Sequence, residues 1–174
     1  EAWQLAVNNS NGQPTAKQVK QAVNNVKEKI TIQKTHIIKN YYSVSEWEDL
    51  DSDVKRVLLS KGGTSKFNPT NDNIEWARYS WNPVTGCLHD CPYCYARDIA
   101  ARFYPQKFEP SFLPERLNAP NITPQKDINS FNNPIDKIGY RNVFTCSMAD
   151  LFGKWVPREW IEAVLNSIRN NPQW

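Results

Sequence analysis

The sequence predicts an α/β protein that contains part of a β/α barrel, preceded by a small helical segment. Three observations predict this class. An alternating apolar and polar stretch begins at Ile74, as in a half-buried strand, and an apolar run at residues 142–148 is typical of a second, buried strand. A helical pattern follows each of them. Strand, helix, strand, helix is the order of parallel β/α architecture, in which helices form the crossovers.

The two helices are predicted from the spacing of apolar residues. Tyr95, Ile99 and Phe103 recur every four residues, and Pro157 opens a helix with an apolar inner face. That face consists of Trp160, Ile161, Val164, Leu165 and Ile168. Residues 104–138 contain six prolines, so we expect an irregular excursion with at most short helical turns. The pattern ends on a helix that should lead into a third strand, so we expect the barrel to be truncated at the carboxy end.

The first 60 residues predict a helical segment. Thr15 is a helix N-cap with a glutamine three residues later, and apolar residues follow at helical spacing. A second helix is expected over residues 45–59. Residues 61–72 are rich in glycine, proline and polar residues, which indicates a linker. The β/α core is then expected over residues 73–174.

Composition limits the class of function. The chain has 174 residues, 40% of them hydrophobic, which is enough for one or two small cores. No apolar stretch is long enough for a membrane span, and the amino terminus shows no secretory signal. We therefore expect a cytoplasmic protein with no membrane partner. The net charge of +3 is too small to indicate nucleic-acid binding by itself.

The positive charge is concentrated near the amino terminus. Residues 11–40 carry six lysines and a single acid, Glu28. A lysine-rich helix face is most often only solvated, but it can also contact phosphates. The string G-Q-P-T-A-K-Q-V resembles helix-turn-helix proteins, so residues 1–60 are a candidate end of a DNA-binding or partition-protein-like domain. Nucleic acid is therefore a candidate partner of this basic helix.

Three of the four cysteines form a cluster. Cys87, Cys91 and Cys94 have the spacing C-x-x-x-C-x-x-C, and the fourth, Cys146, lies in an apolar run. Thiolates this close in sequence can face one centre, and soft sulfur ligands select iron–sulfur clusters, zinc or copper(I). A four-iron cluster held by three thiolates leaves one iron open to an outside ligand. A structural zinc would need a fourth ligand, for which His89 and Cys146 are the candidates.

The residues around the cysteines resemble a known family. Their spacing, with an aromatic residue just before the last cysteine, is similar to the radical S-adenosylmethionine (radical SAM) signature. The wider string W-N-P-V-T-G-C, with R-F, P-E-R-L and S-M-A-D-L-F further along, resembles a phage-associated family of unknown function in the radical SAM group. The resemblance covers residues 74–174 and implies that the expected barrel is the first half of a radical SAM-type (β/α) barrel.

The resemblance also implies cofactors and roles for individual residues. The three clustered cysteines would bind three irons of a [4Fe–4S] cluster, and S-adenosylmethionine would chelate the fourth. Tyr93 would lie against the adenine, while Ser147 and Asp150, after the second strand, are candidates to hold the methionine amine. A reductant such as flavodoxin or ferredoxin would supply the electron that cleaves S-adenosylmethionine to a 5′-deoxyadenosyl radical. The substrate is not indicated.

Several of these residues also have a simpler interpretation. Asp150 is equally suited to capping a helix or a turn, and Cys146 to being a small buried apolar residue. Two hypotheses for the function follow. The first is a radical SAM-like enzyme that uses a [4Fe–4S] cluster, and the second is a zinc-stabilised phage module that binds nucleic acid without catalysis.

Overall fold

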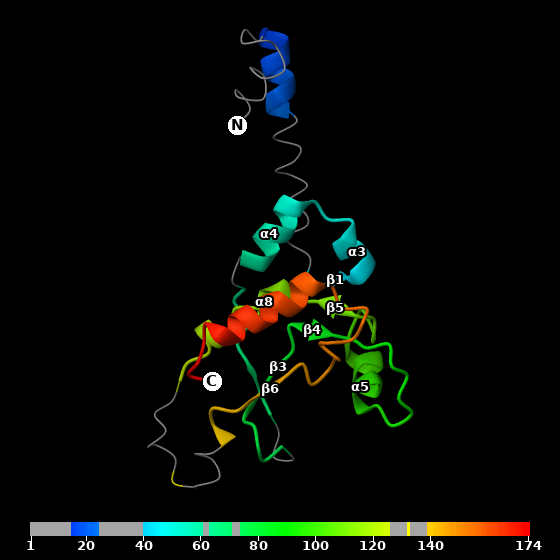
Figure 1. The fold of residues 1–174 in the computed structure, drawn as a ribbon, viewed down its shortest axis with the longest axis vertical. Coiled ribbons are helices and arrows are strands. Elements are labelled where there is room, and N and C mark those ends of the chain that lie inside the picture. The colour runs from blue at the N-terminus through cyan, green and yellow to red at the C-terminus, as the bar shows by residue number, and fades with distance from the viewer. Residues whose placement is uncertain (1–14, 25–39, 61–62, 71–73, 126–131, 133–138) are drawn as a thin grey trace. The chain divides into compact units, whose positions relative to one another are not determined.

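The computed structural model describes residues 15–24, 40–60, 63–70, 74–125, 132 and 139–174. The chain divides into two compact units, residues 1–39 and residues 40–174. In the first unit, residues 16–24 are helical (Figure 1), and the predicted N-cap is confirmed. The Thr15 N–H donates to Gln18 Oε1 at 2.8 Å, and the Gln18 N–H donates to Thr15 Oγ1 at 3.4 Å. The predicted continuation of this helix to residue 30 lies outside the described residues.

The second unit contains two small three-stranded sheets. One has the order β1–β5–β4 and is antiparallel throughout. The other has the order β2–β3–β6, in which β2 and β3 are antiparallel and β3 and β6 are parallel. The strands are β1 Tyr42–Ser43, β2 Asn68–Pro69, β3 Tyr79–Trp81, β4 Val84–Thr85, β5 Ser111–Phe112 and β6 Val143–Thr145. The strand predicted over residues 142–148 is therefore shorter than expected, and it is half-buried because it forms an edge of its sheet.

Helices connect and flank these sheets. They are α3 Val44–Glu48, α4 Ser52–Ser60, α5 Tyr95–Phe103, α6 Ala119–Ile122 and α8 Arg158–Arg169, with a short 3-10 helix at Pro114–Arg116. The single helix predicted over residues 45–59 is divided into α3 and α4. Asp51 Oδ1 accepts a hydrogen bond from the Asp53 N–H at 2.8 Å, which starts α4 as a separate helix. In the part of the chain described above, no helix has the length and apolar character required to cross a bilayer.

The predicted partial β/α barrel is wrong. Among the described strands, only β3 and β6 pair in parallel, and they are joined by a crossover that contains α5. The remaining strand pairs among the described residues are antiparallel, and the strands form two separate small sheets with no closed barrel. The proline-rich excursion explains the difference, because it contributes β5, which pairs with β1 and β4. Alternating strands and helices in the sequence predict the β3–α5–β6 crossover but not this second sheet.

An aromatic core joins the β1–β5–β4 sheet to α3 and α8. Trp47 of α3 packs edge-on against Phe112 and Trp160, with ring centroids 5.3 and 5.8 Å apart. Phe112 stacks on Trp160 at 5.4 Å, and all three side chains are almost completely buried. Because α3 contributes to this core, residues 40–60 belong to the same unit as the cysteines. The linker expected at residues 61–72 falls inside that unit.

Candidate functional site

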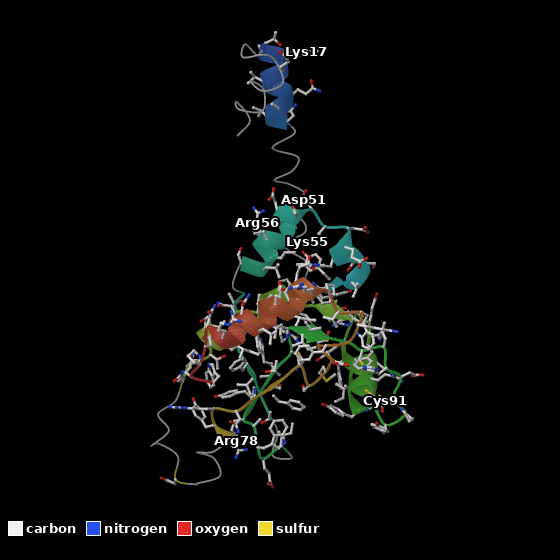
Figure 2. The ribbon with its side chains drawn as sticks, in the orientation of Figure 1. Lys17, Asp51, Lys55, Arg56, Arg78 and Cys91 are labelled. Carbon is white, nitrogen blue, oxygen red and sulfur yellow. The ribbon has the colours of Figure 1, made fainter. Side chains whose placement is uncertain are left out.

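The cysteine loop, residues 86–94, connects β4 to α5, and Figure 2 shows Cys91 on this loop. Backbone hydrogen bonds fix both ends of the loop. The Cys87 N–H donates to Phe108 O at 3.2 Å, and the Cys94 N–H donates to Cys91 O at 3.3 Å. Cys94 is the N-cap residue of α5. All three thiols are partly exposed and free of disulfide bonds. The predicted metal ligands therefore lie on one short loop whose ends are held by the fold.

Gly86 makes the turn into the cysteine loop. Its φ is +87°, and a Cβ at this position would lie 2.3 Å from Glu109 O, so only glycine fits. The Gly86 N–H donates to Met148 O at 2.8 Å, and the residue forms a parallel bridge with Ala149. The cysteine loop thus begins beside the residues that follow β6.

Asn82, which lies between β3 and β4 just before the cysteine loop, holds the segment after β6 in place. The Asn82 side chain is buried, and its Oδ1 accepts from the Met148 N–H at 3.1 Å and from the Ser147 hydroxyl at 3.2 Å. The Cys146 N–H donates to Trp81 O at 2.8 Å, which continues the register of β3 and β6. Ser147, a predicted cofactor contact, therefore lies next to the loop that carries the three clustered cysteines.

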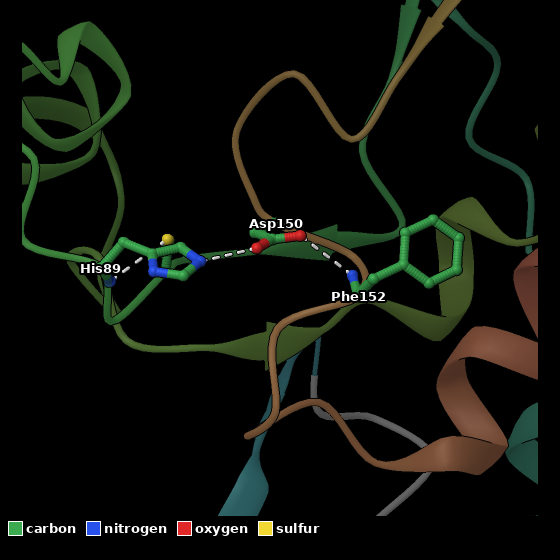
Figure 3. Close-up of polar contacts among 4 residues, drawn as sticks. His89, Asp150 and Phe152 are labelled. Atoms are coloured by element: carbon green, nitrogen blue, oxygen red, sulfur yellow. Dashed lines mark hydrogen bonds and ion pairs between the residues drawn. The ribbon is translucent and has the colours of Figure 1, made fainter.

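Asp150 reaches the cysteine loop through its side chain (Figure 3). Its Oδ2 lies 2.7 Å from His89 Nε2, and its Oδ1 accepts from the Phe152 N–H at 3.1 Å. The His89 ring also meets the Trp155 ring edge-on, with centroids 4.8 Å apart. These residues border a hollow of about 420 Å³, to which Lys154 contributes a cationic side chain. Nothing in the sequence signals the contact between His89 and Asp150, because they are 61 positions apart.

The two tyrosines on either side of Cys94 differ in their surroundings. Tyr93, which is predicted to lie against adenine, is 86% exposed. Tyr95, which is not among the predicted site residues, donates its hydroxyl to Ser147 O at 2.7 Å. Burial raises the pKa of Tyr95, and the charge of Cys94 raises it further. The one signal for Tyr95 in the sequence is its position directly after the last clustered cysteine.

The described residues do not form a ready-made metal-binding geometry. Within the described ranges, no group of three or more His, Cys, Asp or Glu side chains is gathered closely enough to hold a metal ion. The donor set still suits an iron–sulfur cluster or a soft metal, because three accessible thiols lie on one loop. Burial raises the pKa of the Cys146 thiol to about 12, which disfavours the thiolate that a metal binds. Cys146 is therefore set apart from the other three.

Two of the six amino-terminal lysines are described. Lys17 and Lys20 lie on the helix of residues 16–24, and both are exposed (Figure 2 labels Lys17). The other four lysines lie outside the described residues. Exposed lysines on a helix agree equally with a solvated face and with a phosphate-binding face, so nucleic-acid binding stays a prediction.

Fold and site define a mixed α/β domain that carries three thiols on one loop, next to the residues that follow a neighbouring parallel strand. The chain belongs to the family described as protein of unknown function (DUF5131), whose model matches residues 71–174. The match includes the cysteine loop, α5, β6 and α8. No curated protein and no solved structure matches the chain significantly. A family of unknown function is what the sequence predicts, and that much is confirmed, whereas radical SAM chemistry stays a hypothesis.

Proposed function

We propose that the protein is an iron–sulfur protein of the radical SAM type, in which Cys87, Cys91 and Cys94 hold a [4Fe–4S] cluster. The donor set carries this proposal: three free, partly exposed thiols lie on one loop, and the fourth cysteine is buried. Three thiolates on a four-iron cluster leave one iron for an external ligand, which here would be S-adenosylmethionine. The donor set is local to the loop, so it does not require a closed barrel.

The chain's own residues would position S-adenosylmethionine. Tyr93, because it is 86% exposed, offers a ring face for the adenine. The Ser147 hydroxyl, which bonds Asn82 in the free protein, can turn toward the methionine amine. Asp150 supplies a carboxylate of the right charge for the same amine once it leaves His89. When bound and reduced by a donor such as flavodoxin or ferredoxin, the cluster supplies the electron that splits S-adenosylmethionine into methionine and a 5′-deoxyadenosyl radical.

Anaerobic reconstitution with iron and sulfide tests this proposal. The wild type should take up about four irons per chain and show a broad absorbance band at about 400 nm. Cys91→Ala should lose most of the iron, whereas the matched Cys146→Ala variant should keep it, because the Cys146 thiol is buried. Reduction in the presence of S-adenosylmethionine should release 5′-deoxyadenosine. A wild type without iron, or equal iron in Cys91→Ala and wild type, would contradict the proposal.

One contact favours a second candidate function, a zinc-stabilised module. Metal-ligating histidines usually present their other ring nitrogen to a carboxylate, and His89 Nε2 lies 2.7 Å from Asp150 Oδ2. His89 Nδ1 would then complete a Cys₃His site with the clustered cysteines. This candidate predicts one tightly held zinc per chain, which His89→Ala would release. Lys17 and Lys20 would then serve nucleic-acid binding, with an affinity that falls as salt rises.

A further inference from the structure

We infer that His89 and Asp150 form a clasp that holds the middle of the cysteine loop against the segment after β6, and that the clasp sets the position of Cys91. Both residues are positioning residues in this role. The effect of the clasp on a bound cluster rests on the proposed function, but the clasp itself is a property of the metal-free chain.

A further contact orients each of the two side chains of the clasp, Asp150 and His89. Asp150 Oδ1 accepts from the Phe152 N–H at 3.1 Å, which aims Oδ2 at His89 Nε2, 2.7 Å away (Figure 3). On the other side, the Trp155 ring packs edge-on against the imidazole. Gly153 makes room for this ring, because a Cβ at that position would lie 2.5 Å from the indole. Two contacts from one segment therefore converge on His89.

Among the described residues, the clasp is the side-chain hydrogen bond that joins the middle of the loop to the segment after β6, and the Trp155 ring contacts the same imidazole. The other described ion pair of this stretch, Asp90 with Arg97, joins the loop only to its own helix α5. Asp90, the one residue between His89 and Cys91, has a φ of +53°, in the left-handed region. Because a single residue separates His89 from Cys91, we expect a displacement of His89 to move Cys91 as well.

Cys91 is the ligand whose position depends on this tie. Cys87 follows Gly86, which is bonded to Met148 O at 2.8 Å, and Cys94 caps α5. The described backbone bond of Cys91 lies within the loop itself, from the Cys94 N–H to Cys91 O at 3.3 Å. Cys91 is therefore held to the end of the loop, and we infer that its position relative to the segment after β6 depends on the clasp. The clasp side chains are 53% and 40% exposed, so solvent competes with their contact.

Hydrogen exchange in the metal-free chain tests the clasp directly. Asp150→Ala and His89→Ala should each speed exchange of the loop amides by up to about fivefold, the upper end of the effect expected for a partly exposed polar pair. Asp150→Asn keeps one acceptor oxygen where Asp150 uses two, so its exchange should fall between that of the wild type and that of Asp150→Ala. Asp98→Ala is the matched control, because Asp98 is an exposed aspartate of α5. It should leave the loop unchanged.

The double variant separates a clasp from two independent effects. If His89 and Asp150 act through each other, combining the two alanine substitutions adds no further increase in exchange. Loop exchange at the wild-type rate in Asp150→Ala, or fully additive increases in the double variant, would overturn the inference. Exchange of the buried aromatic core around Trp47 and Trp160 reports whether each variant is folded, and it should not change.

The rate of iron release measures how the clasp affects a bound cluster. After reconstitution, Asp150→Ala and His89→Ala should carry the same iron as wild type but release it to a chelator up to about fivefold faster, and Asp98→Ala should not. A wild type that binds no iron defeats the proposed function and leaves the clasp to be decided by exchange. Unchanged iron release in both variants overturns the effect of the clasp on the cluster. Complete loss of metal in His89→Ala alone would make His89 a ligand and overturn its positioning role.

Discussion

Asn82→Ala should weaken the contact between the β3–β4 connection, residues 82–83, and the segment after β6. In the wild type, Asn82 Oδ1 accepts from the Met148 N–H at 3.1 Å and from the Ser147 hydroxyl at 3.2 Å. Met148 is buried, so its N–H loses its partner in a place that water does not reach. Ser147 is half-buried, so its hydroxyl can turn to solvent. The variant therefore leaves one buried donor unpaired.

The expected loss of stability follows from this single unpaired donor, the Met148 N–H. A buried donor left without a partner costs about 1–3 kcal/mol, and the Ser147 hydroxyl adds little, so we expect about 2 kcal/mol of lost stability. With an m value of about 2 kcal/mol/M, the urea midpoint of the second unit should fall by about 1 M. Tryptophan fluorescence reports this transition, because Trp47 and Trp160 are buried in the core of that unit.

Asn121→Ala is the matched control for Asn82→Ala. Asn121 also donates a side-chain hydrogen bond, to Asn118 Oδ1 at 2.7 Å, but both residues are exposed or near the surface. Its loss should change stability by less than about 0.5 kcal/mol. If Asn82→Ala shifts the midpoint no more than Asn121→Ala does, Asn82 does not hold the two segments together, and the reasoning is refuted.

Three further predictions concern the same region. Gly86→Ala should destabilise the fold by more than about 2 kcal/mol in urea unfolding, because a Cβ there would lie 2.3 Å from Glu109 O at a φ of +87°; wild-type stability would contradict this. Iodoacetamide at about pH 8 should modify the three loop cysteines of the metal-free protein and spare Cys146 until unfolding, as read by mass spectrometry; equal labelling of all four would contradict the burial of Cys146. Stability should fall as pH rises from about 9 toward 12, because burial raises the pKa of Cys146 to about 12 and the unfolded state then loses its proton first. Urea midpoints across this range check the trend, which Cys146→Ala should make shallower; a flat profile in the wild type would contradict it.

Local periodicity predicts the helices better than it predicts what they bury. The four-residue recurrence of Tyr95, Ile99 and Phe103 locates α5 correctly, yet these side chains are 55%, 40% and 73% exposed. The buried side of α5 consists of two alanines, Ala96 and Ala100, which carry little hydrophobic signal. The spacing of apolar residues indicates that the segment is a helix, whereas the face of the helix that is buried depends on which other elements pack against it.

Long-range pairing is where sequence patterns stop being informative. The parallel pairing of β3 with β6 follows from the strand–helix–strand order, and it brings Ser147 beside the cysteine loop. The second sheet depends on β5, a two-residue strand inside a proline-rich stretch, for which alternation is too short to see. The contact of His89 with Asp150 likewise depends on two loops meeting in space. Neither feature has a local cause that the sequence could reveal.

The central claim is that three thiolates leave one iron of a cluster open to S-adenosylmethionine. Electron paramagnetic resonance of the reconstituted, reduced protein tests it most directly, with spectra recorded before and after S-adenosylmethionine is added. We expect the signal of a reduced [4Fe–4S] cluster that changes shape when S-adenosylmethionine binds, and that is lost in Cys91→Ala. A protein that shows no cluster signal and carries a single zinc, or a cluster signal that S-adenosylmethionine leaves unaltered, would contradict it.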